Sequence, residues 1–191
     1  MAEHERPTLT DGAITTDQAY AWKAAAARAA VAEIPDGAVI GLGTGTTAQL
    51  MLEALAERVR QGLRVTGVPT SERTRAAADA LGIRLTTLDD VAELTLSIDG
   101  ADEVSLPGLH LVKGRGGASL HEKLVATVSR RRLIIVDESK LVDLLGSAAP
   151  IPVEVIPFGW RQTAERLTRL GGHPTLRPLD TAAIGPDAVP Y

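Results

Sequence analysis

The sequence predicts an α/β protein: a doubly wound, mostly parallel, Rossmann-like sheet, followed by a second, smaller α+β lobe. Two observations lead to this fold class. Short apolar segments alternate with helical segments along most of the chain, and polar or Gly-rich residues follow the ends of the apolar segments. Alternating strands and helices favour a parallel sheet. Polar residues after strand ends lie at the carboxyl edge of such a sheet, where open α/β sheets bind ligands.

The expected elements follow from periodicity and from turn residues. The first helix, at residues 16–34, is rich in Ala, lacks internal Gly and Pro, and stops at Pro35-Asp36-Gly37. Further helices are expected at residues 48–61, 71–81, 119–130 and 161–170. Strands are expected at residues 38–42, 63–68, 94–98, 109–113, 133–136 and 151–156, with a further short one at 84–87.

Proline marks a change of character along the chain, because seven of the eleven prolines lie beyond Gly146. We therefore expect a flexible N-terminal tail at residues 1–13 and an α/β domain at residues 14–146 that carries the candidate site. Residues 147–191 are expected to form the start of the small α+β lobe, which is incomplete because the chain stops without finishing an obvious element.

Composition excludes several classes of protein. The 191 residues include no cysteine, which removes disulfides, thiolate catalysis and Cys-ligated zinc. A net charge of −4 without a basic stripe argues against nucleic acid as a partner. No apolar run reaches the roughly 18 residues that span a bilayer, so no membrane partner is expected. The polar N-terminus lacks the order of a signal peptide, and we expect a cytoplasmic protein.

A turn rich in Gly and Thr follows the first strand, with the sequence Gly41-Leu42-Gly43-Thr44-Gly45-Thr46-Thr47. Glycines let the backbone approach an anion, and the N–H groups of the next helix and the Thr hydroxyls can bind phosphate. The turn also fits a loose dinucleotide fingerprint, but the second strand ends at Pro69-Thr70-Ser71 without the acidic residue that binds ribose. The simplest alternative is a tight turn with Thr as the helix N-cap.

Three carboxylates follow the third strand, in Asp99-Gly100-Ala101-Asp102-Glu103. Carboxylates close together have pKa values that are pushed apart, which suits acid–base chemistry. A metal site is the rival interpretation. No histidine lies nearby at ligand spacing, so we expect none. An acidic surface turn is the remaining alternative.

A lysine and a Gly-rich turn precede the next helix, in Lys113-Gly114-Arg115-Gly116-Gly117. Lys113 is expected to be the counter-charge of the acidic loop. Glu122 has two interpretations, because Ser119 and Glu122 have the spacing of a capping box and Glu122 is also a candidate base. Lys23 and Lys140 are two of only four lysines, although a solvated surface lysine is the ordinary interpretation of either.

Together these stretches resemble the ribose-5-phosphate isomerase family of the A type. The similarity is carried, in order, by the Gly-Thr turn 41–48, the acidic segment 97–103, the Lys-Gly turn 113–118 and Val136-Asp137-Glu138-Ser139-Lys140. Pro152-Val153-Glu154-Val155-Ile156-Pro157 and Leu170-Gly171-Gly172 are also similar, so the resemblance spans about residues 19–178.

The resemblance implies an aldose–ketose isomerase that interconverts ribose 5-phosphate and ribulose 5-phosphate in the non-oxidative pentose phosphate pathway, without metal or organic cofactor. Glu122 would be the proton acceptor, Lys113 would stabilise an enediolate, and Asp99 or Asp102 would assist ring opening. The residues implied to bind substrate are Lys23, Thr44, Gly45, Thr46, Thr47, Asp99, Gly100, Ala101, Asp102, Lys113, Gly114, Arg115, Gly116 and Lys140.

The resemblance also implies a homodimer whose partner is a small-molecule sugar phosphate. Two departures from the family pattern bear on it. Family members continue beyond the last residue of this chain, and His121 stands where an arginine is more usual. Two rival functions stay open: a sugar-phosphate sensor on the same fold that lacks catalysis, and a dinucleotide-dependent oxidoreductase. A nicotinamide or flavin nucleotide that protects the protein against melting would favour the latter.

Overall fold

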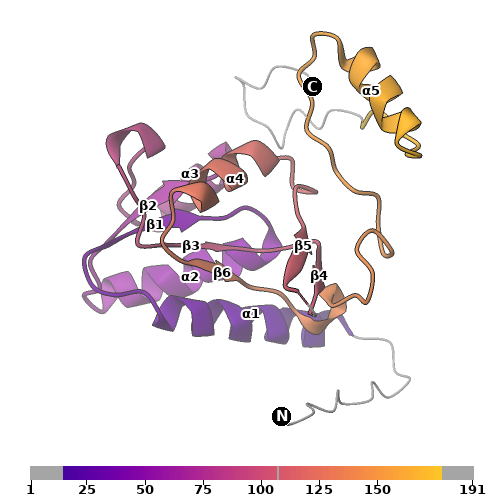
Figure 1. Cartoon of the computed structure of the whole chain (residues 1–191). Coiled ribbons are helices and arrows are strands. Elements are labelled where there is room, and N and C mark those ends of the chain that lie inside the picture. The colour runs from indigo at the N-terminus through magenta and orange to yellow at the C-terminus, as the bar shows by residue number, and fades with distance from the viewer. Residues whose placement is uncertain (1–14, 107, 178–191) are drawn as a thin grey trace.

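A computed structural model of the chain describes residues 15–106 and 108–177. The expected N-terminal tail at residues 1–13 and the last residues of the expected small lobe lie outside this range. The described part is an α/β structure, as predicted, with a sheet between two layers of helices (Figure 1). None of the described helices is both long enough and apolar enough to cross a membrane.

The main sheet has four parallel strands in the order β2-β1-β3-β6. They are β1 (Ala38–Leu42), β2 (Val65–Pro69), β3 (Leu96–Asp99) and β6 (Arg132–Ile134). In register, Ile40 lies between Gly67 of β2 and Leu96 of β3. From β1 the chain first moves outward to β2, and from β3 it moves outward to β6 in the opposite direction. The strand order therefore reverses between β1 and β3, which is where open α/β sheets form ligand crevices.

Helices cover both faces of the sheet because three of its four strands, β1, β2 and β3, are mostly buried and apolar. One apolar cluster joins the sheet to α1 (Thr16–Ala32), α2 (Thr46–Arg60) and α3 (Glu72–Ala80). A second cluster on the other face includes Val125 of α4 (Ser119–Thr127). Figure 1 shows α1 and α2 below the sheet and α4 above it. The predicted helices are confirmed, with ends that differ by at most three residues.

A small hairpin follows β3. Its strands β4 (Glu103–Ser105) and β5 (His110–Val112) are antiparallel, and Glu103 is paired with Val112. The acidic stretch was expected to be a loop, so β4 was not predicted. Two short 3-10 helices, η1 (Leu88–Asp90) and η2 (Glu138–Lys140), lie between the longer elements along the chain. Residues 84–87 form only an isolated bridge, between Leu85 and Gly67.

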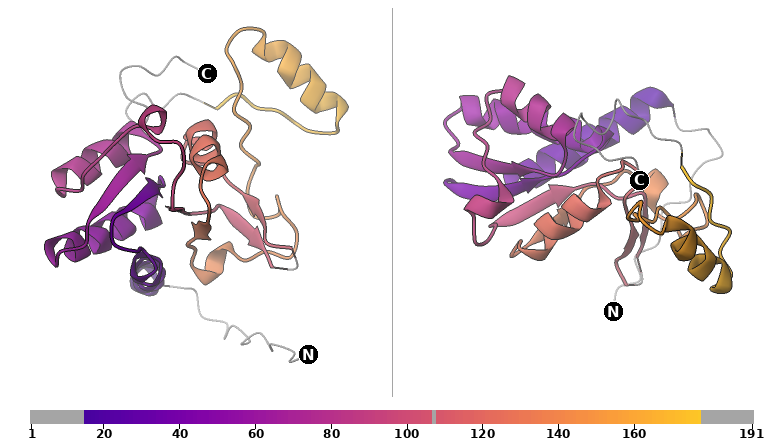
Figure 2. Two further views of the ribbon diagram at one scale, coloured as in Figure 1. Left: turned by 60° about the vertical axis from the view of Figure 1, so that its left-hand side comes forward. Right: turned by 90° about the horizontal axis from the view of Figure 1, so that it is seen from above.

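The expected strand at residues 151–156 is wrong. This segment is extended but has no strand beside it, and Pro152 and Pro157 cannot donate to a ladder. The chain passes along the outside of the sheet layers to α5 (Trp160–Arg169), and the described residues continue to 177 (Figure 2). The helix that we expected at residues 161–170 is confirmed, whereas the division of the chain into an α/β domain and a small lobe stays a prediction.

Candidate active site

The turns after β1 and β3 touch at the carboxyl edge of the sheet. A Cβ atom on Gly43 would lie 2.1 Å from Oδ1 of Asp99, so no larger residue fits there without displacing the carboxylate. Oδ1 of Asp99 accepts hydrogen bonds from the backbone N–H of Thr44 at 3.2 Å and of Gly100 at 2.8 Å. The close approach of the two turns therefore fixes the orientation of a carboxylate that is only 7% exposed.

Lys113 lies between two carboxylates. Its Nζ is 2.9 Å from Oδ2 of Asp99 and 3.1 Å from Oε2 of Glu122, and it donates to the carbonyl of Gly100 at 2.5 Å. Burial lowers the pKa of Lys113, but the charges of Asp99 and Glu122 outweigh that effect and raise the pKa overall. The lysine is therefore a fixed cation, which confirms the prediction that it is the counter-charge of the acidic loop.

Glu122 points inward from the first turn of α4 and is 5% exposed. Its Oε2 atom is 3.1 Å from Nζ of Lys113, and no other hydrogen-bond donor reaches that atom among the described residues. Burial raises the pKa of this carboxyl, the nearby charge of Asp99 raises it further, and Lys113 acts in the opposite direction. A buried carboxylate with a raised pKa beside a fixed cation has the properties of a general base.

The capping-box interpretation of Glu122 is wrong. The N-cap of α4 is Ala118 rather than Ser119, and no side chain within the helix caps its N-terminus. The reason is local: the carboxylate turns toward Lys113, where a charge compensates its burial.

The three acids of the 99–103 segment have different partners. Asp99 meets Lys113, whereas Oδ2 of Asp102 accepts the N–H of Arg115 at 3.0 Å. Glu103 is 1% exposed and accepts the N–H groups of Gly146 and Ala148 at 2.5 and 2.9 Å. The hydrogen bond from Gly146 is the main cause that lowers the pKa of Glu103. The alternative of an acidic surface turn is therefore wrong.

A cluster of hydroxyl groups surrounds Thr44, whose N–H contacts Asp99. Of this cluster, the sequence analysis named only Thr44 as a site residue. Oγ1 of Thr44 is 2.8 Å from that of Thr70, 2.9 Å from Oγ of Ser71 and 3.3 Å from Oγ1 of Thr74. Thr70 and Ser71 follow β2, just as Thr44 follows β1. The rule that found the other stretches, polar residues after a strand end, would have found these as well.

The predicted phosphate-binding residues stand at the N-terminus of α2. Gly45 is the N-cap, with φ at +121°, and no side chain caps this helix, so the alternative of a Thr cap is wrong. Thr46 and Thr47 form its first turn. The Lys-Gly turn lies close by, because a Cβ on Gly116 would be 3.6 Å from Cγ2 of Thr44.

The two remaining predicted lysines lie near Asp137. Nζ of Lys23 is 3.9 Å from Oδ2 of Asp137, and Lys140 ends the 3-10 helix that Asp137 caps. No hydrogen bond or ion pair among the described residues links either lysine to Glu122. Sequence reasoning thus found the central cluster, and it also named residues that lie around that cluster without touching it.

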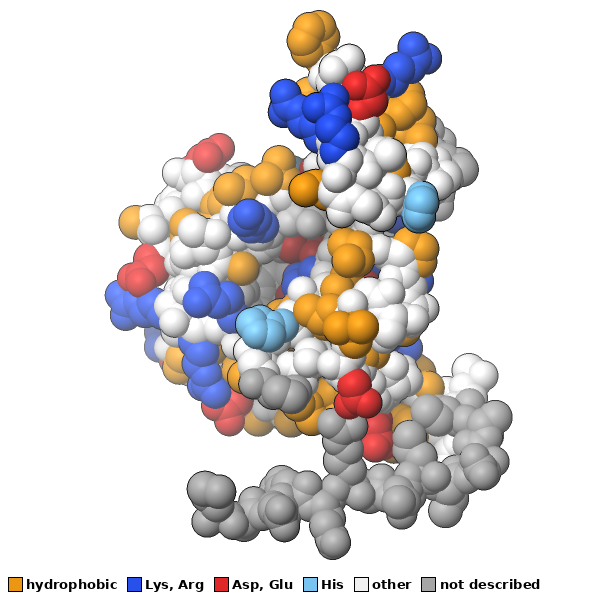
Figure 3. All heavy atoms as spheres, turned by 45° about the vertical axis from the view of Figure 1, so that its right-hand side comes forward, with side chains coloured by type: hydrophobic (Ala, Val, Ile, Leu, Met, Phe, Trp, Pro, Cys, Tyr) orange, Lys and Arg blue, Asp and Glu red, His pale blue; other side chains and the backbone are white. Residues whose placement is uncertain are grey.

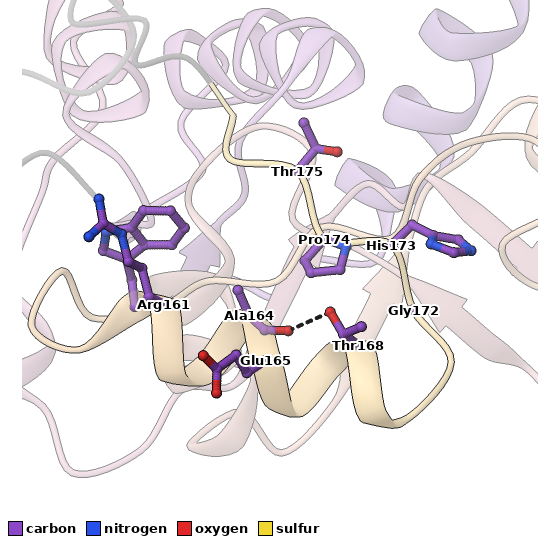
Figure 4. A pocket seen from close by; sticks show the side chains of 9 residues that line it. Arg161, Ala164, Glu165, Thr168, Gly172, His173, Pro174 and Thr175 are labelled. Carbon is purple, nitrogen blue, oxygen red and sulfur yellow. Dashed lines mark hydrogen bonds between the residues drawn. The ribbon is translucent and has the colours of Figure 1, made fainter.

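Two hollows are visible on the surface. Figure 3 shows acidic and basic side chains together at the bottom of the hollow between the body of the protein and the segment that leads to α5. The other hollow, of about 570 Å³, runs along α5 (Figure 4). It is lined by Trp160, Arg161, Ala164, Glu165, Thr168, Gly172, His173, Pro174 and Thr175. It contains neither Glu122 nor Lys113, so it lies outside the candidate site.

Comparisons with known proteins agree on one family. A family model described as ribose 5-phosphate isomerase A (phosphoriboisomerase A) matches residues 66–186. A protein from Gloeobacter violaceus named ribose-5-phosphate isomerase A is 58% identical over 169 residues, which cover 88% of this chain and 74% of the relative. Across the curated relatives the chain spans between 60% and 74% of their length.

Solved structures give the same answer. Ribose 5-phosphate isomerase A from Methanocaldococcus jannaschii superposes with a TM-score of 0.81 at 42% identity, over 84% of this chain and 72% of that one. A D-ribose-5-phosphate isomerase in complex with phospho-erythronic acid superposes with a TM-score of 0.77 at 39% identity, over 80% of this chain and 67% of that one. The chain belongs to the ribose 5-phosphate isomerase A family.

Proposed function

We propose that this chain interconverts ribose 5-phosphate and ribulose 5-phosphate. The observation that carries the proposal is the buried Glu122 carboxylate, whose Oε2 atom pairs with Lys113 at 3.1 Å and whose pKa is raised by burial. Family membership supports the substrate. The related isomerase that was solved with phospho-erythronic acid, an anionic sugar phosphate, supports the ligand class.

The phosphate group binds at the N-terminus of α2. The first N–H groups of a helix have no partner within the helix, and they favour an anion. Thr46 and Thr47 add hydroxyl donors in that turn, and Lys23 adds a positive charge from α1. The sugar then extends along residues 99–102 and 113–116, toward the carboxylate of Glu122.

Glu122 moves the proton that the reaction requires. In the open aldose its carboxylate removes the proton from C2, and the electron pair forms an enediolate with negative charge on O1. Lys113 stabilises that charge. The same carboxyl returns the proton to C1, while the hydroxyl proton of O2 passes to O1, which completes the ketose. The sugar neither gains nor loses electrons overall, so the proton transfers described here balance the reaction.

Ring opening falls to Asp102 in this proposal. Both oxygens of Asp99 are already engaged, Oδ1 by two N–H groups and Oδ2 by Lys113. Among the described residues Asp102 accepts a hydrogen bond only at Oδ2, from the N–H of Arg115, so its other oxygen can exchange a proton with the ring hydroxyl. We also propose that the protein is cytoplasmic and forms a homodimer. Sedimentation of the purified chain would test the dimer.

The decisive experiment mixes the 191-residue chain with ribose 5-phosphate in EDTA and follows ribulose 5-phosphate. Glu122→Gln keeps the shape of the side chain but removes the base, and it should lower kcat by about 10²–10⁴. Glu57→Gln, an exposed glutamate of α2, is the matched control and should leave kcat unchanged. Turnover that survives in Glu122→Gln would overturn the role of Glu122. If ribose 5-phosphate raised the melting temperature but was not converted, the sensor alternative would be supported instead.

A further inference from the structure

A polar contact connects the Pro152–Pro157 motif to the helix that carries Glu122. Oε2 of Glu154 accepts the backbone N–H of Leu120 at 2.7 Å. Next to this contact, Pro152 lies against the Lys-Gly turn, where its Cγ atom would be 3.3 Å from a Cβ on Gly114. The motif therefore touches the two elements that carry Lys113 and Glu122.

Leu120 is the second residue of α4 and precedes Glu122 by two positions. The N–H groups of a first helical turn have no acceptor inside the helix, and an acidic side chain there stabilises the turn. Ala118, the N-cap, has no side chain that accepts a hydrogen bond, and none caps the helix from that position. Glu154 supplies the missing acceptor from 34 residues away along the chain.

The start of the same segment is also anchored. The buried carboxylate of Glu103 in β4 accepts the N–H groups of Gly146 and Ala148. The partner strand of that hairpin, β5, leads directly into Lys113. Residues 146–154 are thus attached to the hairpin at one end and to α4 at the other, so they link the two elements that meet in the Lys113–Glu122 pair.

We propose that Glu154 is a positioning residue: by holding the first turn of α4, it keeps the carboxylate of Glu122 beside Lys113. The proposal rests on the isomerase function proposed above. Glu154 does not reach the reacting atoms. Its effect passes through the backbone of Leu120, which lies in the same first turn of α4 as Glu122.

Kinetics of Glu154→Ala and Glu154→Gln test the proposal. Loss of the acceptor in Glu154→Ala should lower kcat by about tenfold and leave KM within about twofold, because the contact is to the helix and not to the sugar. Glu154→Gln keeps a carbonyl acceptor and should recover most of kcat. Glu165→Ala, which removes an exposed glutamate of α5 paired with Arg169 at 3.5 Å, is the control and should change neither constant.

NMR of the same variants gives a readout that does not need turnover. In Glu154→Ala, hydrogen exchange at the Leu120 amide should accelerate, and the titration midpoint of Glu122 should fall toward the ordinary value as the carboxyl becomes more exposed. If the wild-type chain turned over no sugar, the isomerase proposal would fail while these measurements still decided the role of Glu154. Unchanged Leu120 exchange, or a lower melting temperature with normal kcat per folded molecule, would overturn the positioning role.

Discussion

The carboxyl edge of the sheet and the segment at residues 147–177 contrast in what they bury. At the sheet edge the charged groups are inside: Asp99, Glu103 and Glu122 are each less than a tenth exposed. In the later segment the apolar groups are outside, with Phe158 95% exposed and Leu170 84% exposed. Soluble domains usually show the opposite arrangement of both kinds of residue.

The contrast has a physical cause on each side. A charge can be buried only where fixed partners compensate its lost hydration, and at the sheet edge Lys113 and backbone N–H groups provide them. The later segment has no partner strand, and its polar links to the core include Glu154 with Leu120 and Arg177 with the carbonyl of Arg115. Its apolar side chains consequently stay exposed. The proposed chemistry therefore lies in the first region, which the second region contacts at Leu120 and Arg115.

Among the variants that compare the two regions, Lys113→Met should have the largest effect, because it breaks the charge compensation of the first region. Loss of the cation that faces the developing enediolate should lower kcat by about 10²–10³. Lys123→Met removes an exposed lysine next to Glu122 on α4 and is the control, with kcat expected to be unchanged. Similar losses in both variants would show that general positive charge, rather than the position of Lys113, matters.

The pH profile of Lys113→Met sharpens the same prediction. Glu122 acts as a base only when ionised, so activity should rise with pH through its pKa. That pKa is already above the ordinary 4.5, and Lys113 lowers it. Removal of Lys113 should therefore move the acid limb of kcat/KM to higher pH. An acid limb that stayed in place, or moved to lower pH, would contradict the assignment of the limb to Glu122.

Gly43→Ala should have the next largest effect, because it disturbs the contact between the two turns. The new Cβ would lie 2.1 Å from Oδ1 of Asp99, so the carboxylate must move away from Lys113. We expect about 1–3 kcal/mol less stability and roughly a tenfold to hundredfold lower kcat. Urea unfolding and steady-state kinetics measure the two quantities.

Gly67→Ala is the matched control for Gly43→Ala. Gly67 lies in β2, and its new Cβ would be 2.4 Å from Cδ1 at the flexible end of the Leu42 side chain. Asp99 is not among the atoms that this Cβ would meet. The variant should cost stability while kcat per folded molecule stays normal. If both glycine variants lost the same fraction of kcat, the close approach at Gly43 would have no special role in the site.

The central cluster was predictable from the sequence because open α/β sheets concentrate function in one place. Asp99 and the turn at Thr44 lie at the ends of the neighbouring parallel strands β3 and β1, and such strand ends meet at one edge of the sheet. Lys113 follows β5 of the antiparallel hairpin, and its charge opposite to that of the acidic loop predicted the pairing. The role of Glu122 was not predictable from the residues alone, since a capping box has the same spacing. Only the family resemblance favoured the base.

The failures in the sequence analysis have a shared physical reason. The apolar segment 151–156 reads as a strand, but a strand forms only where another offers its backbone groups, and the sequence does not reveal that neighbour. In the same way, Glu103 and Glu154 find their partners at Gly146 and Leu120, more than 30 residues away. Local pattern identifies which residues are polar or apolar, whereas distant packing decides what they contact.

The smallest effect should come from Phe158→Ala in the later region, compared with Ile98→Ala in the first. Ile98 is fully buried in β3, and its truncation leaves a cavity that should cost about 2–5 kcal/mol. Phe158 is 95% exposed, so its truncation should change the free energy of unfolding by less than about 0.5 kcal/mol and leave kcat unchanged. Urea unfolding at two protein concentrations measures both. A larger loss in Phe158→Ala that grows with protein concentration would mean that a second copy covers this face in solution, and the contrast between the two regions would then hold only for the isolated chain.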